Sequence, residues 1–466
     1  MITMKQVFNI ITSILLLSAV TGCKKYVDIK TQGSLVPQET INFRYLLNNT
    51  YTFEATVRMP DLAADDINII DSAQMAQLVT STFYTYFVNA YTWQPAVYTV
   101  LGESDAEWDR MYNLIYNCNA IIAETPGSTG GSDSLKNVII AEAKVHRADA
   151  YLTLVNMYAK PYNAATAATD EGVPLVTTPT VDAKLSRAPV ANVYKLIIDD
   201  LTSVSSYLPK KNLFNTLPSR AAAFAVLARA NLYMGNYEQA GNWADSVLAI
   251  QNTLNNLSTL TTFSYPARLK DPEIILSKIS HASSNAFMPT AFRLSDSLLN
   301  LLGTNDLRYN LFTLPASDYS ATLYTGRFFS KERIGSYDNR NLGPSVPEMM
   351  LIKAEALARK GQISDALATA NTLRQNRFTT AAYTPLTATT ANEALVQIIK
   401  ERQREFFCRG LRWFDMRRLK NDPLFTQTIT RKFRGTTYTL EPNSNRYVFP
   451  ISDYYRQFNP GITANP

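Results

Sequence analysis

The pattern that decides the fold class is in residues 221–250, AAAFAVLARANLYMGNYEQAGNWADSVLAI. Leu227 and Ala228 belong to an apolar run that precedes Gly235, and Ala240 follows Ala228 by twelve positions. Small residues at matched positions allow two helices to cross closely, and the glycine between them allows a tight turn. The segment is therefore predicted to form two antiparallel helices joined at Gly235.

The same pattern recurs in residues 349–378, MMLIKAEALARKGQISDALATANTLRQNRF. Here Lys353 and Ala354 precede Gly361, and Ala366 follows the first alanine by twelve positions. Both segments match the spacing of a tetratricopeptide helical hairpin. Because the two copies are 126 residues apart, the sequence predicts a helical scaffold with large insertions rather than a regular solenoid.

Apolar residues at intervals of three and four predict further helices in the scaffold. One covers residues 108–122, a second residues 139–158, and a third residues 190–208, where Pro209 stops it. The loop at residues 125–132, TPGSTGGS, separates the first two. These helices extend the scaffold toward the N-terminus.

Two stretches differ from the scaffold in composition. Residues 65–105 and 255–345 are rich in polar and aromatic side chains, and loops of this length are usually functional. Short strands are expected at residues 273–279 and 327–334. The predicted fold is therefore mainly α, with tetratricopeptide-like hairpins forming a scaffold, a large irregular loop-rich lobe, and a few short strands.

Composition excludes several classes of function. The 466 residues carry 45 basic and 39 acidic side chains and a net charge of +6, without the Lys/Arg block of a nucleic-acid-binding protein. The two histidines, His146 and His281, are isolated, and the sequence lacks C-x-x-C, H-E-x-x-H, P-loop and G-x-S-x-G motifs. We expect no cofactor; Asp-rich loops are compatible with Ca²⁺, but no EF-hand spacing indicates it.

The N-terminus is typical of an exported, lipidated protein. Residues 1–22 have the basic start and short apolar stretch of a signal peptide, too short to span a bilayer stably. They end in AVTG before Cys23, which resembles the bacterial lipobox and predicts lipidation of Cys23. Residues 23–40 form the expected lipidated tether. Which leaflet displays the protein stays open at this point.

The two remaining cysteines, Cys118 and Cys408, lie in apolar helical surroundings. Two thiols in an exported protein can pair, but the sequence does not give their separation. Buried free thiols are the favoured interpretation.

Residues 398–418, IIKERQREFFCRGLRWFDMRR, resemble the E-R-x-x-E-F/L…G-x-R-W-x-D-L-x-R signature of SusD/RagB lipoproteins, the outer-membrane nutrient-binding proteins of Bacteroidetes. Other segments resemble the same family, in the same order: RADAY at 147–151, GVPLV at 172–176, DLR at 306–308, PEMMLIKAEA at 347–356 and the tail at 449–461. One departure is Arg409, where the family usually has glutamate. The resemblance covers nearly the whole chain and implies a single domain over residues 41–466, with the insertions at about 65–105 and 255–345.

The charged residues of this signature have two interpretations. Glu401, Arg404 and Glu405 share one side of a predicted helix and are placed to pair with each other or with Arg412 and Arg417. They form either a binding site or a structural knot that joins the C-terminal helices to the core. We favour the structural interpretation.

The resemblance implies a surface-exposed outer-membrane lipoprotein that binds a nutrient, a glycan in most members, and delivers it to a TonB-dependent SusC-like barrel. A peptide ligand, as in some members, and a helical interaction scaffold without a small ligand are the alternatives. A glycoside hydrolase would need two carboxylates about 5–9 Å apart. Acidic clusters such as Asp65-Asp66, Glu103, Asp105 and Asp109 arise by chance among 39 acids, so we expect no catalysis.

A sugar site requires aromatic platforms beside polar side chains. Trp93 is the first candidate, near where the family often places a ligand-facing aromatic residue, and its replacement by alanine is expected to weaken binding and leave the fold intact. The other candidates in the first insertion are Tyr84, Tyr86, Tyr91 and Asn89, with Gln94 beside them. Those in the second insertion are Tyr309, Tyr324, Tyr337 and Arg340.

Overall fold

The computed structural model describes residues 37–80, 85–100, 102–180, 183–280, 292–318, 323–330 and 341–465. Some sequence-based predictions therefore lie outside the described residues: the signal peptide, most of the tether, Cys23, Tyr84, Tyr337 and Arg340. Among the helices of the described ranges, none is both long enough and apolar enough to cross a bilayer.

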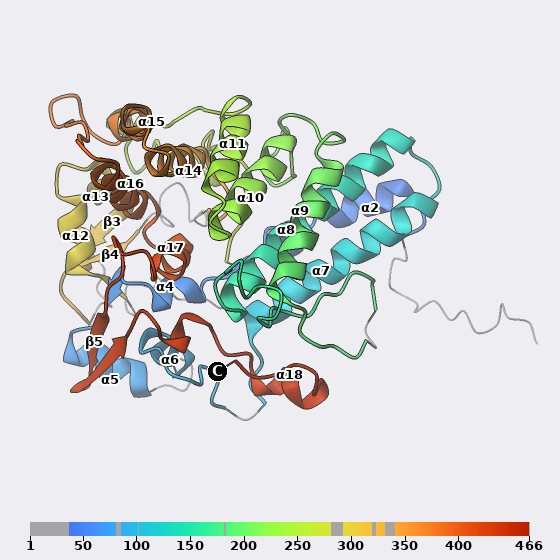
Figure 1. Ribbon diagram of the computed structural model, residues 1–466, viewed down its shortest axis with the longest axis horizontal. Coiled ribbons are helices and arrows are strands. Elements are labelled where there is room, and N and C mark those ends of the chain that lie inside the picture. The colour runs from blue at the N-terminus through green and yellow to red at the C-terminus, as the bar shows by residue number, and fades with distance from the viewer. Residues whose placement is uncertain are drawn as a thin grey trace, which may run out of the picture.

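The scaffold is a row of helices that pack side by side (Figure 1). In chain order they are α7 (Ala106–Glu124), α8 (Asp133–Tyr158), α9 (Val190–Val204), α10 (Arg220–Tyr233), α11 (Tyr237–Leu248), α14 (Val346–Arg359), α15 (Ile363–Gln375) and α16 (Ala391–Phe406). The predicted helices and both hairpins are confirmed, as is the mainly α fold class.

The starts of α7, α8 and α16 in the scaffold coincide with capping side chains in the sequence. Asp105 accepts hydrogen bonds from the first amides of α7, and Ser132 accepts one from the amide of Leu135 at the start of α8. Thr390 and Glu393 form a reciprocal capping box at the start of α16. Such side chains satisfy amides that have no partner inside the helix, so the boundaries are encoded locally.

The two hairpins, far apart in sequence, are direct neighbours in space because α11 packs against α14. A Cβ atom placed on Gly241 of α11 would lie 2.8 Å from the Cβ of Ala356 on α14. Only a glycine at this position allows the helices to approach so closely. The insertion between the hairpins therefore leaves the row of helices continuous.

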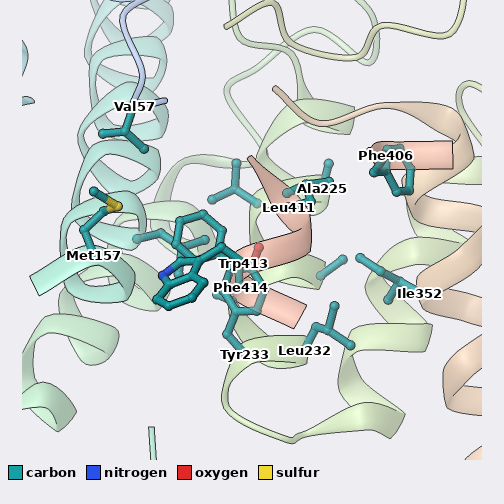
Figure 2. Packing of buried hydrophobic residues seen from close by; sticks show 14 of the residues in the cluster. Val57, Met157, Ala225, Leu232, Tyr233, Ile352, Phe406, Leu411, Trp413 and Phe414 are labelled. Atoms are coloured by element: carbon teal, nitrogen blue, oxygen red, sulfur yellow. The ribbon is translucent and has the colours of Figure 1, made fainter. Parts of the chain in front are cut away.

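Trp413 lies at the centre of the core. It belongs to α17 (Leu411–Leu419), has no exposed surface, and stacks on Tyr447 with ring centroids 5.3 Å apart. Figure 2 shows Trp413 between side chains of α8 and α10, including Met157 and Leu232. The C-terminal signature thus joins the scaffold to the end of the chain.

The charged residues of the signature form a buried network. Arg308 pairs with Asp306, Glu401 and Glu405 at 2.6–2.7 Å. Arg377 also pairs with Glu405, at 2.9 Å. Further along the signature, Arg402 and Arg418 share Asp415, Arg418 also binds Glu355, and Arg412 binds Asp65 through two hydrogen bonds. These contacts agree with the structural interpretation of the signature.

The remaining elements are those of the loop-rich lobe, at the left and lower left of Figure 1, and two helices outside it: α2, which packs on α8, and α18 near the end of the chain. The helices are α2 (Thr40–Leu47), α3 (Thr50–Phe53), α4 (Met59–Ala63), α5 (Ser72–Thr80), α6 (Thr85–Tyr91), α12 (Asp296–Leu302), α13 (Leu307–Phe312) and α18 (Asp453–Phe458). The strands form three antiparallel pairs: β1 (Ile67–Asn68) with β2 (Arg293–Leu294), β3 (Thr313–Pro315) with β4 (Arg327–Phe329), and β5 (Ile429–Phe433) with β6 (Thr436–Leu440).

Two sequence-based predictions about this lobe need correction. Residues 65–105 are not uniformly irregular, because they contain α5 and α6. Residues 273–279 do not form a regular strand. They are buried, but a turn and bends interrupt them. Several backbone bonds go to residues 342–346, where Ile274 makes an isolated bridge with Ser345, while Ser277 donates to Asn215 and Ile279 donates to Glu54. The bends limit the pairing with residues 342–346 to an isolated bridge, so no regular strand forms.

Neither Cys118 nor Cys408 is in a disulfide, and both are fully buried. The favoured interpretation, buried free thiols rather than a disulfide, is confirmed. Burial raises the pKa of the Cys118 thiol to about 12.

Candidate functional site

The two insertions that the sequence sets apart meet in the loop-rich lobe. Strand β1 of the first insertion pairs with β2 of the second, with Ile67 opposite Leu294 and Asn68 opposite Arg293. The rings of Phe87 and Phe292 make an edge contact at 5.9 Å between centroids. One lobe is thus built from both stretches.

A groove with a volume of about 370 Å³ lies in this lobe between α6 and the β5–β6 hairpin. We call it the α6–hairpin groove. Its lining residues are Val79, Val88, Asn89, Thr92, Gln94, Phe433, Arg434, Thr436 and Tyr438. Its volume is within the range of about 300–1,000 Å³ that is usual for small-ligand sites.

The hairpin presents a basic and an aromatic side chain to the groove. Arg434 and Gly435 form the two-residue turn between β5 and β6, with φ of 49° and 81°. Positive φ at both positions matches the right-handed twist of the strands and favours glycine. Tyr438 is half-buried and Arg434 is exposed.

Amide side chains cover the opposite side. The Asn89 Nδ2 donates to the Val97 carbonyl at 3.0 Å, and the Gln94 Nε2 donates to the Thr92 hydroxyl at 3.1 Å. Amides and a guanidinium can each bind sugar hydroxyls, while a tyrosine ring can pack on the apolar face of a sugar. The groove has the chemistry expected of a glycan site.

Trp93 and Tyr91 do not line this groove, which corrects the prediction that they are ligand platforms. Tyr91 has no exposed surface, and Trp93 is 6% exposed with its Nε1 donating to the Ala63 carbonyl at 3.0 Å. The guanidinium of Arg431 lies 4.1 Å from the centroid of the Tyr91 ring and 4.3 Å from that of Trp93. The two rings stabilise a buried cation, so neither has a free face for a sugar.

The other predicted aromatic residues are also outside the groove. Tyr324 is 7% exposed, and its hydroxyl donates to the carbonyl of Phe292, so it is a packing residue rather than a platform. Tyr309 is half-buried under the guanidinium of Arg327, 4.2 Å from its ring centroid. Tyr86 is half-buried beside Tyr98 and accepts a hydrogen bond from Arg58.

The sequence-based prediction therefore included Asn89 and the neighbouring Gln94 among the lining residues of this groove, and did not include Arg434, Thr436 or Tyr438. Residues 429–440, ITRKFRGTTYTL, carry the signal that would have found them. Polar and apolar side chains alternate around Arg434-Gly435, which is the pattern of a β-hairpin.

Two carboxylates from the acidic clusters of the first insertion, Asp65 and Asp105, are engaged in structural contacts. Asp65 binds Arg412, and Asp105 caps α7 and accepts from the Tyr158 hydroxyl. Burial and the neighbouring charge of Asp65 raise the pKa of Asp66 to about 7, and burial likewise raises that of Glu107 to about 7. Within the described ranges, no cluster of three His, Cys, Asp or Glu residues could hold a metal ion.

Two family models match separate parts of this chain. One, described as "starch-binding associating with outer membrane", matches residues 25–232, and the other, described as the SusD family, matches residues 322–466. The chain is similar to the SusD-like protein P2 of Formosa agariphila, with 26% identity over 191 residues. That match covers 40% of this chain and 36% of the relative, so it spans about a third of the relative's length.

Solved structures share the fold over nearly the whole chain. A SusD superfamily protein of Bacteroides thetaiotaomicron has a TM-score of 0.74 at 22% identity and covers 92% of this chain and 100% of its own. A SusD-like carbohydrate binding protein of Bacteroides vulgatus has a TM-score of 0.68 at 20% identity and covers 91% and 97%. The sequence signature, the two family models and the shared architecture agree: the chain belongs to the SusD family.

Proposed function

We propose that this protein is an outer-membrane lipoprotein that binds a glycan nutrient at the cell surface and delivers it to a TonB-dependent SusC-like transporter. The α6–hairpin groove is the observation that carries the proposal, because it combines a tyrosine ring with amides and an arginine. The family description, starch-binding associating with outer membrane, supports the glycan and the location. The protein binds its nutrient without chemical change.

The binding step is tested with the full-length lipoprotein in detergent against a panel of soluble glycans. Calorimetry on the hits gives the affinity, and chromatography of the mixtures detects products. Tyr438→Ala and Arg434→Met are expected to weaken binding at least tenfold, which corresponds to about 1.4 kcal/mol. Released products would contradict the binding function and indicate an enzyme.

A matched control separates the groove from general surface effects. Tyr207 is 52% exposed and does not line the groove, so Tyr207→Ala is expected to leave glycan affinity unchanged. Equal binding by the native protein and both groove variants would place the site elsewhere in the molecule.

The anchor and the partner need separate tests. Replacing Cys23 with serine is expected to abolish incorporation of labelled palmitate and to release the protein from the membrane. In the native membrane, the lipoprotein is expected to copurify with a large outer-membrane barrel. Its purification without any barrel under mild detergent would contradict delivery to a transporter.

A further inference from the structure

A second cavity lies on the scaffold side of the molecule, with a volume of about 400 Å³. It is bordered by the segment after α8, the turn between α10 and α11, the end of α17, and residues 444–448. None of its lining residues belongs to the α6–hairpin groove. We call it the Arg417 cavity.

Arg417 is 2% exposed and lines this cavity. Its Nη2 donates to the carbonyl of Ala159 at 2.5 Å, while its Nε and Nη1 have no hydrogen-bond partner among the described residues. Nη2 carries two N–H hydrogens and uses one of them for the Ala159 carbonyl. Its second hydrogen therefore remains available beside that of Nε or Nη1, so one edge of the guanidinium keeps two parallel donors. Such an edge matches the two oxygens of a carboxylate.

Arg417 also lacks a counter-charge, unlike the buried arginines around it. Arg418, next in sequence, pairs with Glu355 and Asp415 at 2.7 and 2.8 Å. For Arg417, no carboxylate of the described ranges lies within ion-pair distance. Burial lowers its pKa to about 10, and only Tyr194 and Tyr233 act in the opposite direction. A buried guanidinium without an anion is unfavourable, so the site favours an anionic partner.

Two further groups in the cavity, Tyr233 and Lys420, also favour an anionic or hydrogen-bonding partner. The hydroxyl of Tyr233, which is 6% exposed, is a second buried polar group without a partner in the described structure. The Lys420 ammonium donates a hydrogen bond to the Pro442 carbonyl. Burial and the charge of Arg417 both disfavour the protonated form of Lys420 and so lower its pKa. The carboxylate at the rim, Asp170, is already paired with Lys160 at 2.8 Å.

The remaining lining is typical of a sugar site rather than of a simple anion site. Tyr162 lines the cavity as a half-buried ring, and the exposed amides of Asn163, Asn421 and Asn445 surround its mouth. The ring of Tyr237 lies under the guanidinium of Arg359, and that of Tyr447 is stacked on Trp413. Tyrosine rings pack on the faces of sugars, and amides bind hydroxyls on both their donor and acceptor sides. The volume falls within the usual range for a small ligand.

We propose that the Arg417 cavity binds an acidic sugar, a uronic acid, whose carboxylate is held by Arg417 and whose hydroxyls contact Tyr233 and the rim amides. This site stands independently of the α6–hairpin groove and gives the protein a second specificity, for acidic rather than neutral sugars.

The test uses the full-length lipoprotein with sodium glucuronate and galacturonate as probes, and with glucose, galactose, acetate and sulfate as comparisons. Calorimetry and saturation-transfer NMR measure binding. The uronates are expected to bind at least tenfold more tightly than the neutral sugars and the simple anions. No uronate binding at millimolar concentration, or equal binding of glucose or acetate, would overturn the proposal and leave water as the partner of Arg417.

Two variants locate the binding. Arg417→Met keeps the side-chain volume, removes the unpaired charge, and is expected to weaken uronate binding at least tenfold while leaving the thermal midpoint unchanged or higher. Tyr233→Phe removes one hydroxyl without a change in packing and is expected to weaken it severalfold, which tests the site even if the first variant folds poorly. Unchanged uronate affinity in both variants would overturn the assignment.

Arg434→Met is the matched control, because it removes an arginine from the other site. It is expected to leave uronate affinity unchanged while it weakens binding of the glycan that the α6–hairpin groove takes. Because the two ligands are measured on the same variants, failure of the acidic-sugar site is distinguishable from failure of the proposed glycan function. Loss of uronate binding in Arg434→Met would place the uronate in the α6–hairpin groove and overturn the proposal.

Discussion

Arg308 and Glu405, 97 positions apart in the sequence, form an ion pair of 2.7 Å in which the side chains are 0% and 1% exposed. Glu405 also binds Arg377, which in turn binds Glu273 at 2.8 Å. The Glu405 carboxylate therefore joins α16 to the second insertion directly through Arg308 and indirectly, through Arg377, to Glu273. This network anchors the loop-rich lobe to the scaffold.

Replacing Glu405 with glutamine leaves Arg308 and Arg377 with one fewer anion each inside the protein. Removing one partner of a buried pair typically costs about 3–5 kcal/mol, and we expect a loss of that size in the free energy of unfolding, measured with urea. Glu238 is the matched control, because it pairs with Lys360 at the surface with 71% of its side chain exposed. Glu238→Gln is expected to change stability by less than about 0.5 kcal/mol, and a similar loss in both variants would contradict the prediction.

Acid is expected to destabilise the protein through the same carboxylate. Burial alone would raise the pKa of Glu405, but Arg377 and Arg308 outweigh burial and hold it at about 2, below its ordinary value of 4.5. As the pH falls, the Glu405 carboxylate binds a proton in the unfolded chain at a higher pH than in the folded protein. Its contribution to the free energy of unfolding is therefore present above pH 4.5 and is lost as the pH falls from 4.5 toward 2. The free energy of unfolding should fall over this window. The slope should be shallower in Glu405→Gln, and identical slopes would rule out Glu405 as its source.

Asp66 is expected to change stability with pH in the opposite direction, so that stability falls as the pH rises. Its pKa of about 7 lies above its ordinary value of 3.8, because of burial and the charge of Asp65. The folded protein therefore binds the extra proton between these values, and stability should decline as the pH rises from about 4 to 7. Asp66→Asn keeps an oxygen to accept from the Cys408 amide and should flatten this decline in unfolding curves. A decline of unchanged steepness would indicate other groups.

Replacing Trp93 with alanine is expected to destabilise the fold. Its indole packs on Arg431 and its Nε1 binds Ala63, so Trp93→Ala removes a buried ring and leaves a cavity beside a cation. Such truncations typically cost about 3–5 kcal/mol, which a lowered urea midpoint would reveal. Phe263 is 95% exposed, so Phe263→Ala is the control and should have little effect. A Trp93→Ala protein of native stability would contradict the core assignment.

The thiols of Cys118 and Cys408 are expected to be unreactive in the native protein. Both are buried, and the raised pKa of Cys118 keeps it protonated; thiol reagents attack the thiolate. Ellman's reagent should detect neither thiol in native protein and both after unfolding in guanidinium chloride without reductant. Fewer than two on unfolding would reveal a disulfide.

Local patterns in the sequence were sufficient for the scaffold. The spacing of Ala228, Gly235 and Ala240 predicted the α10–α11 hairpin, and the same spacing predicted the α14–α15 hairpin. Helical periodicity and capping depend on residues a few positions apart, which the sequence shows directly. The signature around Trp413 likewise indicated the family and a structural role before any contact was known.

Tertiary structure decided which side chains are available to a ligand. Trp93 and Asn89 are four positions apart, yet Trp93 packs on Arg431 inside the lobe while Asn89 lines the groove with Tyr438. The pairing of Arg308 with Glu405 and the missing counter-charge of Arg417 likewise depend on residues distant in sequence. Exposure and charge compensation follow from contacts between distant segments, and no local spacing in the chain records them.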